Sequence, residues 1–129
     1  MIGTRLHHLA LGAQDVERIA AFYRDLLALP EVARHRLPDG TLRSVWLDLG
    51  GAVLMIERTA EPPRRVADVG AGLFLLALAC AAERREAWER SLTSAGVRIE
   101  GRTEHTSYFR DPEGNRVAIS SYPFNIFQK

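Results

Sequence analysis

The order of apolar and polar residues divides the chain into two halves that follow the same plan. Each half begins with a short strand-like run, continues with apolar residues at helical spacing, and ends with three more short strand-like runs. In the first half the strands are expected at residues 5–11, 32–37, 42–49 and 52–58, and the helix at 16–27. In the second half the strands are expected at residues 73–80, 97–100, 106–110 and 116–121, and the helix at 82–94. Each half is therefore predicted to have the order β-α-β-β-β.

Residues that begin or end helices and turns lie at the boundaries of these elements. Asp15 can accept hydrogen bonds from the first amides of the first helix, and Pro30 stops that helix. Gly96 fits the position just after the second helix. Residues 38–40 (Pro-Asp-Gly) and 111–115 (Asp-Pro-Glu-Gly-Asn) are turn sequences, because proline fixes φ and glycine accepts a positive φ.

The two halves also share sequence. Residues 6–11 and 73–78 both follow the frame Leu-x-x-Leu-Ala-Leu, whose two middle positions are histidines in the first copy and apolar residues in the second. Aligning residues 48–51 on 111–114 brings an aspartate and a glycine into register as well. We interpret this as an internal duplication; the alternative is two unrelated α+β halves that resemble each other by chance.

Charge argues against a nucleic-acid partner. The 129 residues are enough for one compact domain or two small intertwined modules, and 47% of them are hydrophobic. The 17 Lys and Arg residues nearly balance the 16 Asp and Glu residues, so the chain has no large basic surface with which to bind phosphate backbones. No nucleic acid is expected as a partner.

Cysteine content and apolar runs limit the classes of protein to which the chain can belong. Cys80 is the only cysteine, which excludes an intramolecular disulfide and a cysteine-based metal cluster. The longest apolar run, residues 73–82, is shorter than the roughly 20 residues that a membrane span needs, and no signal peptide is visible at the start. We therefore expect a cytoplasmic protein that does not bind a membrane.

Two motifs carry a resemblance to a known family. The opening segments His8–Leu11, Asp15–Arg18 and Phe22–Leu27, together with the late segment Tyr108–Asn115, are similar to the vicinal oxygen chelate superfamily. That group includes glyoxalase I, extradiol dioxygenases, fosfomycin-resistance thiol transferases and bleomycin-binding proteins. The resemblance covers nearly the whole chain, but one fold can host many activities.

The resemblance implies a fold and a site. The fold class is α+β: two tandem βαβββ modules, at about 5–58 and 73–122, form curled mixed sheets around a shared cleft. The linker at 59–72 joins them into a single domain over 1–129. In metal-dependent members the ligands come from the first and last strand of each module.

The metal positions of the family are mostly lost in this chain. Carried over by the resemblance, they fall on His8, Met55, Leu75 and Ala118. Of these only His8 can bind a metal, whereas catalytic ions usually need about three protein ligands. No cofactor is therefore expected at the usual site. A divalent metal (Zn, Ni, Fe or Mn) would need a non-standard set, such as His8 with Glu57 and a residue of a partner chain.

Strand alternation selects the side chains that share the cleft with these positions. Met55 and Glu57 lie on one face of their strand, and family analogy places Tyr108 inward on another. The repeat alignment makes Val45 the counterpart of Tyr108, and puts Trp46 on the opposite face. The expected acid–base residues are His8, Glu57 and Tyr108. The expected cleft residues are Arg43, Val45, Met55, Leu75, Thr106, Arg110 and Ala118.

Each polar candidate also has a purely structural interpretation. His8 can be a half-buried histidine that hydrogen-bonds within the fold, and Glu57 can be a solvated carboxylate or the partner of an arginine. Tyr108 can simply pack at the mouth of the cleft. Arg110 can form a local ion pair with Asp111.

Three functions remain open. The first is a metal-independent member that binds a small, largely apolar or aromatic molecule, either to sequester it or to process it by acid–base chemistry. The second is a metal-dependent lyase, isomerase or dioxygenase with the non-standard ligand set. The third is a regulatory or interaction module that kept the fold. A homodimer is expected in all three, by the resemblance and because short curled sheets leave edges to be covered.

Overall fold

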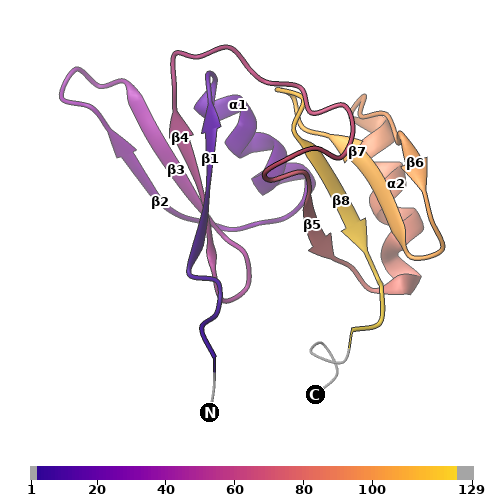
Figure 1. Cartoon of the computed structure of the whole chain (residues 1–129). Helices are drawn as coiled ribbons and strands as arrows, with labels where there is room; N and C mark the ends of the chain where they lie inside the picture. The colour runs from indigo at the N-terminus through magenta and orange to yellow at the C-terminus, as the bar shows by residue number, and fades with distance from the viewer. Residues whose placement is uncertain (1–2, 125–129) are drawn as a thin grey trace. The chain divides into compact units, whose positions relative to one another are not determined.

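The structure is a computed structural model, and it describes residues 3–124 of the chain (Figure 1). The chain divides into two compact units between Pro63 and Arg64. Each unit has its own sheet, its own helix and its own core. In the described part of the chain no helix is long and apolar enough to cross a bilayer.

The first unit contains one mixed four-stranded sheet and one helix. Its elements are β1 (His8–Ala13), α1 (Val16–Ala21) with a π-helical turn (Phe22–Leu26), β2 (Glu31–Arg36), β3 (Leu42–Asp48) and β4 (Val53–Arg58). The strand order is β1-β4-β3-β2, in which β1 pairs with β4 in parallel and the other pairs are antiparallel.

The second unit repeats this topology. Its elements are β5 (Leu76–Ala79), a 3₁₀ turn (Ala82–Arg84), α2 (Arg85–Ser94), β6 (Gly101–Arg102), β7 (Thr106–Arg110) and β8 (Arg116–Ser120). The strand order β5-β8-β7-β6, with β5 parallel to β8, is the order of the first unit shifted by four strands. The α+β fold of tandem βαβββ modules is therefore confirmed.

Strand register agrees with the repeat at the first and last strands of each module. Ala10 pairs with Met55 in the first sheet, and Ala77 pairs with Ala118 in the second. The sequence alignment matches these two pairs residue for residue. Of the four positions that the resemblance assigns to metal ligands, His8 is thus structurally equivalent to Leu75, and Met55 to Ala118.

Register differs from the alignment at the third strand. Trp46 pairs with Met55, and Tyr108 pairs with Ala118, so Trp46 is the structural counterpart of Tyr108. The cause is the hairpin, because four residues (49–52) separate the paired strands in the first module and five (111–115) in the second. A shift of one residue moves every side chain of the strand to the other face.

Helix α1 begins where the sequence predicts. The side chain of Asp15 accepts a hydrogen bond from the Arg18 amide at 3.1 Å, and the buried face of α1 packs on β3 and β4. Burying these apolar side chains supplies most of the stability of such a helix. The fully buried core residues of this unit include Ile19, Ala20, Tyr23, Val45, Leu47, Leu54 and Ile56.

Helix α2 covers one face of the second sheet. Arg85 and Glu89 of α2 both bond the hydroxyl of Ser107 on β7, so α2 lies over the face that carries Ser107 and Phe109. Leu92 of α2 is fully buried in the core of this unit. In both units the helix covers one face of the sheet, and we call the other one the helix-free face.

Several element boundaries differ from the prediction; for example, the strand expected at 73–80 is the shorter β5 (Leu76–Ala79). The first strand begins at His8 rather than at residue 5, and the strand expected at 97–100 is absent. The Val97 amide donates to the Leu92 carbonyl at 2.9 Å, so the start of this segment closes the end of α2, and the amide of Glu100 at its other end reaches β7, where it donates to the Tyr108 carbonyl. The strand in this place is the two-residue β6.

Candidate functional site

The helix-free face of the first sheet carries two of the expected acid–base residues far apart. His8 pairs with Val53, whereas Glu57 pairs with Gly12, four residues further along the parallel strands. At about 3.3 Å per residue, His8 and Glu57 are offset by about 13 Å. A metal ion bound by both side chains of one chain, as the non-standard ligand set requires, does not fit this register.

His8 has a neighbour that the sequence did not indicate. The Nδ1 atoms of His7 and His8 lie 2.9 Å apart, and the two rings meet edge to face at 5.1 Å. Adjacent residues within a strand point to opposite faces. Because β1 begins at His8, His7 lies outside the strand and its ring can turn toward His8.

The same face carries a cluster of contacting side chains around Trp46. The indole Nε1 donates to Glu57 Oε2 at 3.2 Å, and the His35 ring lies 4.5 Å from the indole, centroid to centroid. Ser44, which pairs with both His35 and Glu57, is fully buried. Neither His35 Nε2 nor Ser44 Oγ, both buried, has a hydrogen-bond partner among the described residues.

One expected cleft residue, Val45, is corrected by this cluster. Val45 is fully buried on the helix side of the sheet, and Trp46 takes the helix-free face in its place. Arg43 lies at the register shift between His35 and Arg36 of β2, where the strict alternation of faces along β3 is interrupted. The error follows from the one-residue difference in length between the two hairpins. Because of this difference, the repeat alignment matched Tyr108 with Val45 instead of Trp46.

The helix-free face of the second sheet brings together most of its expected residues. Tyr108 pairs with Ala118, and Thr106 pairs with Ser120, whose hydroxyl lies 2.7 Å from that of Thr106. Ala118 is fully buried. Leu75 lies one residue before β5 and two residues before Ala77, so the two residues share a face, and Ala77 also pairs with Ala118.

Arg110 has a structural role, and its partner is not the one expected. Its Nε donates to both carboxylate oxygens of Glu100, at 3.1 and 3.2 Å, and its Nη1 bonds the carbonyls of Gly114 and Val66. Asp111, which the sequence proposed as the partner, instead holds the turn: its Oδ1 accepts from the amides of Glu113 and Asn115.

Arg116 flanks Ala118 on its strand, and the sequence interpretation assigned it no role in the site. Its guanidinium carbon lies 4.4 Å from the centroid of the Phe74 ring and 5.7 Å from that of Tyr108. Such distances are typical of cation–π contacts. A sequence signal for its position existed, because Arg116 lies two residues before Ala118 on the same strand and therefore shares its face. Its aromatic partners, however, lie on other segments.

Cys80 does not offer a nucleophile. It is half-buried at the end of β5, and burial raises the pKa of its thiol, against a smaller opposite effect of Arg85. The thiolate is the reactive form, so a raised pKa makes the residue less reactive at neutral pH.

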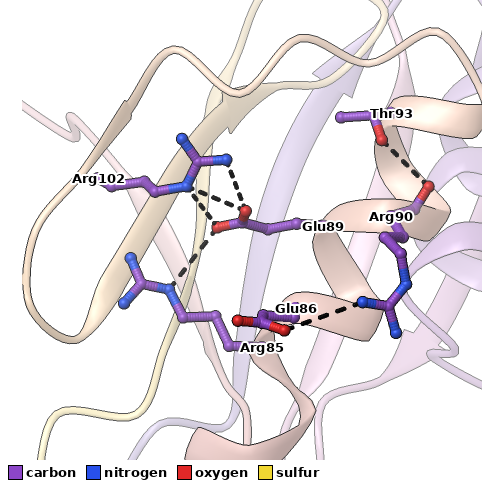
Figure 2. A pocket seen from close by; sticks show the side chains of 6 residues that line it. All are labelled: Arg85, Glu86, Glu89, Arg90, Thr93 and Arg102. Carbon is purple, nitrogen blue, oxygen red and sulfur yellow. Dashed lines mark hydrogen bonds and ion pairs between the residues drawn. The ribbon is translucent and has the colours of Figure 1, made fainter.

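An open depression beside α2 is lined by Arg102 of β6 and by five residues of the helix: Arg85, Glu86, Glu89, Arg90 and Thr93 (Figure 2). Figure 2 shows the guanidinium groups of Arg85 and Arg102 on either side of the Glu89 carboxylate, which Arg102 Nη2 approaches to 2.7 Å. Glu86 and Arg90 form a further ion pair. Each charged side chain of this depression therefore has an oppositely charged partner, and we assign the depression a structural role.

The Glu89 interactions predict an acid-dependent loss of stability. The hydrogen bond from Arg102 lowers the pKa of Glu89, and one from Ser107 adds to the effect. A carboxylate with a depressed pKa in the folded state stabilises the fold fully above its unfolded pKa of about 4.3, and this contribution is lost as the pH falls through the folded value. In Glu89→Gln the contribution is absent at every pH.

Denaturant unfolding from pH 7 to pH 3 checks this prediction. The difference in unfolding free energy between wild type and Glu89→Gln is expected to shrink below about pH 4.3. Glu86→Gln is the matched control, since the Glu86 side chain is 92% exposed and its variant should show no such trend. A constant difference for Glu89→Gln across the range would contradict the assignment.

Among residues 3–124, no three His, Cys, Asp or Glu side chains form a group that could hold a metal ion. Of the four inherited ligand positions, three are Met55, Leu75 and Ala118, which supply no oxygen or nitrogen donor. At these four positions the side chains of the described residues therefore do not supply the ligand set of a catalytic divalent ion.

Comparison with known proteins places this fold in a family context. The model of the Glyoxalase/Bleomycin resistance protein/Dioxygenase superfamily matches residues 5–119. A lactoylglutathione lyase from Agrobacterium tumefaciens is similar in structure, with 23% identity, 92% of this chain and 93% of that chain covered, and a TM-score of 0.68.

Two further solved structures show the same fold. A mutant of the fosfomycin resistance protein FosX from Listeria monocytogenes, in complex with Mn(II) and 1S,2S-dihydroxypropylphosphonic acid, has a TM-score of 0.79, 15% identity and coverage of 99% of this chain and 100% of its own. TioX from Micromonospora sp. ML1 has a TM-score of 0.69, 20% identity and coverage of 93% and 100%. At these identities the likeness establishes the fold alone.

Proposed function

We propose that this chain, which belongs to the Glyoxalase/Bleomycin resistance protein/Dioxygenase superfamily, binds a small, largely apolar or aromatic molecule without the divalent metal of the family. The observation that carries the proposal is the donor set. Met55, Leu75 and Ala118 occupy three of the four ligand positions, and only His8 keeps a donor.

The side chains of the two helix-free faces support an apolar ligand. The first face presents Trp46 and Met55, and the second presents Tyr108, with Phe74 stacked beside it on Arg116. Apolar and aromatic walls with a few polar groups are typical of small-molecule sites. His8 is the polar group of the first face that the family position singles out.

Acid–base processing of the bound molecule is an extension of this proposal. His8, Glu57 and Tyr108 are the groups that could transfer protons, and the hydrogen bond from Trp46 fixes one carboxylate oxygen of Glu57. Binding alone needs none of these proton transfers.

A metal-dependent lyase, isomerase or dioxygenase remains the second candidate. It is favoured by the retained His8 and by the Mn(II) present in the similar FosX structure. In this case the missing ligands come from a partner chain, because the donors within one chain do not suffice.

Metal analysis of the purified protein separates the two candidates. We expect far less than one equivalent of Zn, Ni, Fe or Mn per chain after dialysis. A stoichiometric metal that survives dialysis, and that His8→Ala removes, would establish the second candidate instead.

Ligand binding can be followed through Trp46. The chain has two tryptophans, so Trp88→Phe leaves Trp46 as the only indole emitter. We expect N-phenyl-1-naphthylamine, a neutral aromatic probe, to bind saturably and to quench Trp46 emission by energy transfer. Absence of any saturable binding would contradict the proposed function.

His8→Ala is expected to raise the Kd of this probe at least about tenfold while leaving the unfolding free energy within about 0.5 kcal/mol of wild type, because His8 is exposed. The same Trp88→Phe background and the same titration serve as the measurement. His105→Ala is the control and should leave the Kd unchanged. An unchanged Kd in His8→Ala would mean that His8 is only structural.

A homodimer is part of the proposal. In each sheet two edge strands, β1 and β2 or β5 and β6, have one side without a partner in the order of that sheet, and such edges are usually covered in native proteins. Sedimentation equilibrium is expected to give the mass of two chains, and a monomer at micromolar concentration would argue against the dimer.

A further inference from the structure

Arg116 combines a fixed position with unused hydrogen-bond donors. The Phe74 ring lies 4.4 Å from its guanidinium carbon and the Tyr108 ring 5.7 Å from it. Packing between aromatic rings restricts the guanidinium plane, so less conformational entropy is lost when it binds a ligand. The Nε atom is buried and has no hydrogen-bond partner among residues 3–124.

The charge of Arg116 is not matched within the described part of the chain. Arg110, its direct cross-strand partner, takes both carboxylate oxygens of Glu100. None of the ion pairs of the described residues involves Arg116. A guanidinium has five N–H donors and no acceptor, and leaving such donors unpaired at a half-buried position is costly.

The position of Arg116 coincides with the lost metal positions of the second module. It alternates with Ala118 on β8, and the register of β5 on β8 places Leu75 beside it. Ala118 and Leu75 supply no donor for a cation. In this module the positive charge at the site therefore comes from the Arg116 side chain and not from a metal ion.

We propose that Arg116 binds the anionic group of the ligand, a carboxylate, sulfonate or phosphonate attached to a planar apolar body. This inference rests on the proposed function and names its ligand class. The fork of N–H groups matches two oxygens of such an anion, and charge-assisted bonds of this kind are about twice as strong as neutral ones. The aromatic rings beside it pack against the apolar body.

Two fluorescent probes of nearly the same shape test this inference. 8-Anilinonaphthalene-1-sulfonate carries a sulfonate, and N-phenyl-1-naphthylamine is the same ring system without it. Both are titrated into wild type, Arg116→Met, Arg116→Lys and Arg98→Met. Arg98 is the control, because it is exposed in the same unit and loses the same charge. Circular dichroism melts confirm that each variant is folded.

We expect wild type to bind the sulfonate probe at least tenfold more tightly than the neutral probe, a difference of about 1.4 kcal/mol. Arg116→Met removes this preference by weakening the sulfonate probe alone, Arg116→Lys keeps part of it, and Arg98→Met keeps all of it. Added salt should weaken the sulfonate probe in wild type but not in Arg116→Met.

Each other result overturns one idea or both. If only the neutral probe binds, or if Arg116→Met leaves the preference intact, the inference fails and the proposed function stands. Equal weakening of both probes by Arg116→Met would make Arg116 a packing residue, with the same consequence. If neither probe binds wild type, the proposed function fails as well.

Discussion

Replacing Arg85 with methionine is expected to lower the free energy of unfolding by about 3 kcal/mol. The Arg85 guanidinium donates to the carbonyls of Thr103, Glu104 and Thr106 at 2.8 to 2.9 Å, and to Ser107 Oγ at 2.8 Å. Hydrogen bonds to a charged group contribute about 1.5–3 kcal/mol each. Because two of these carbonyls lie near the surface and regain water in the variant, the total loss is well below the sum.

Urea unfolding at pH 7 measures this effect, and hydrogen exchange locates it. The Thr103 amide, which donates to the Thr106 carbonyl at 2.9 Å, should lose protection in the variant beyond the global loss of stability. Arg84→Met is the matched control: Arg84 is exposed, and its substitution should change stability by no more than about 0.5 kcal/mol. An effect of Arg85→Met no larger than that of the control would show that the loop after β6 is held by other contacts.

Replacing Phe109 with alanine is expected to cost about 4 kcal/mol, within the range of 3–5 kcal/mol for buried aromatic residues. Only 1% of the surface of Phe109 is exposed, and it lies on the helix side of β7. The variant loses the burial of the ring and leaves a cavity that the surrounding core cannot fill completely.

Thermal and denaturant unfolding test this expectation together. Phe124→Ala is the control, because Phe124 is 53% exposed and its ring lies against that of Tyr122, 4.7 Å away between ring centroids. Its loss should cost no more than about 1 kcal/mol. Similar losses in the two variants would contradict the placement of Phe109 in the core and support the opposite face for β7.

The fold was predictable because local signals agreed with one another. The strand-helix order, the Asp15 cap and the two turn sequences all place element boundaries through short-range patterns, and the repeat supplied the topology. The prediction of a strand at 97–100 was wrong because the Val97 amide hydrogen-bonds to the Leu92 carbonyl at the end of α2. Apolar alternation does not reveal such a contact. The two-residue β6 is too short for any periodic signal.

The candidate site was predictable where it depended on the first and last strands. There the repeat alignment and the register agree, because Ala10 pairs with Met55 and Ala77 pairs with Ala118. The third strand failed because one extra residue in a hairpin changes which face each side chain takes. Arg116 was missed because its partners Phe74 and Tyr108 are brought to it only by the sheet.

Membership in the superfamily and the fold are established, and the site remains a proposal with specific tests. The metal analysis, the Trp46 titration and the paired probes ask separate questions about cofactor, ligand and ligand charge. Together they distinguish a binding protein from a metal enzyme completed by a partner chain.

Each sheet takes all four of its strands from one continuous half of the chain, so among the described residues no strand pairing within a sheet joins the two halves. A duplicated gene with this architecture can specialise its copies independently. In the first module the position that the resemblance assigns to a metal ligand is His8, and in the second it is Leu75, with Arg116 beside it against the rings of Phe74 and Tyr108. The same independence suggests that the halves can be recombined with those of relatives to build new ligand preferences.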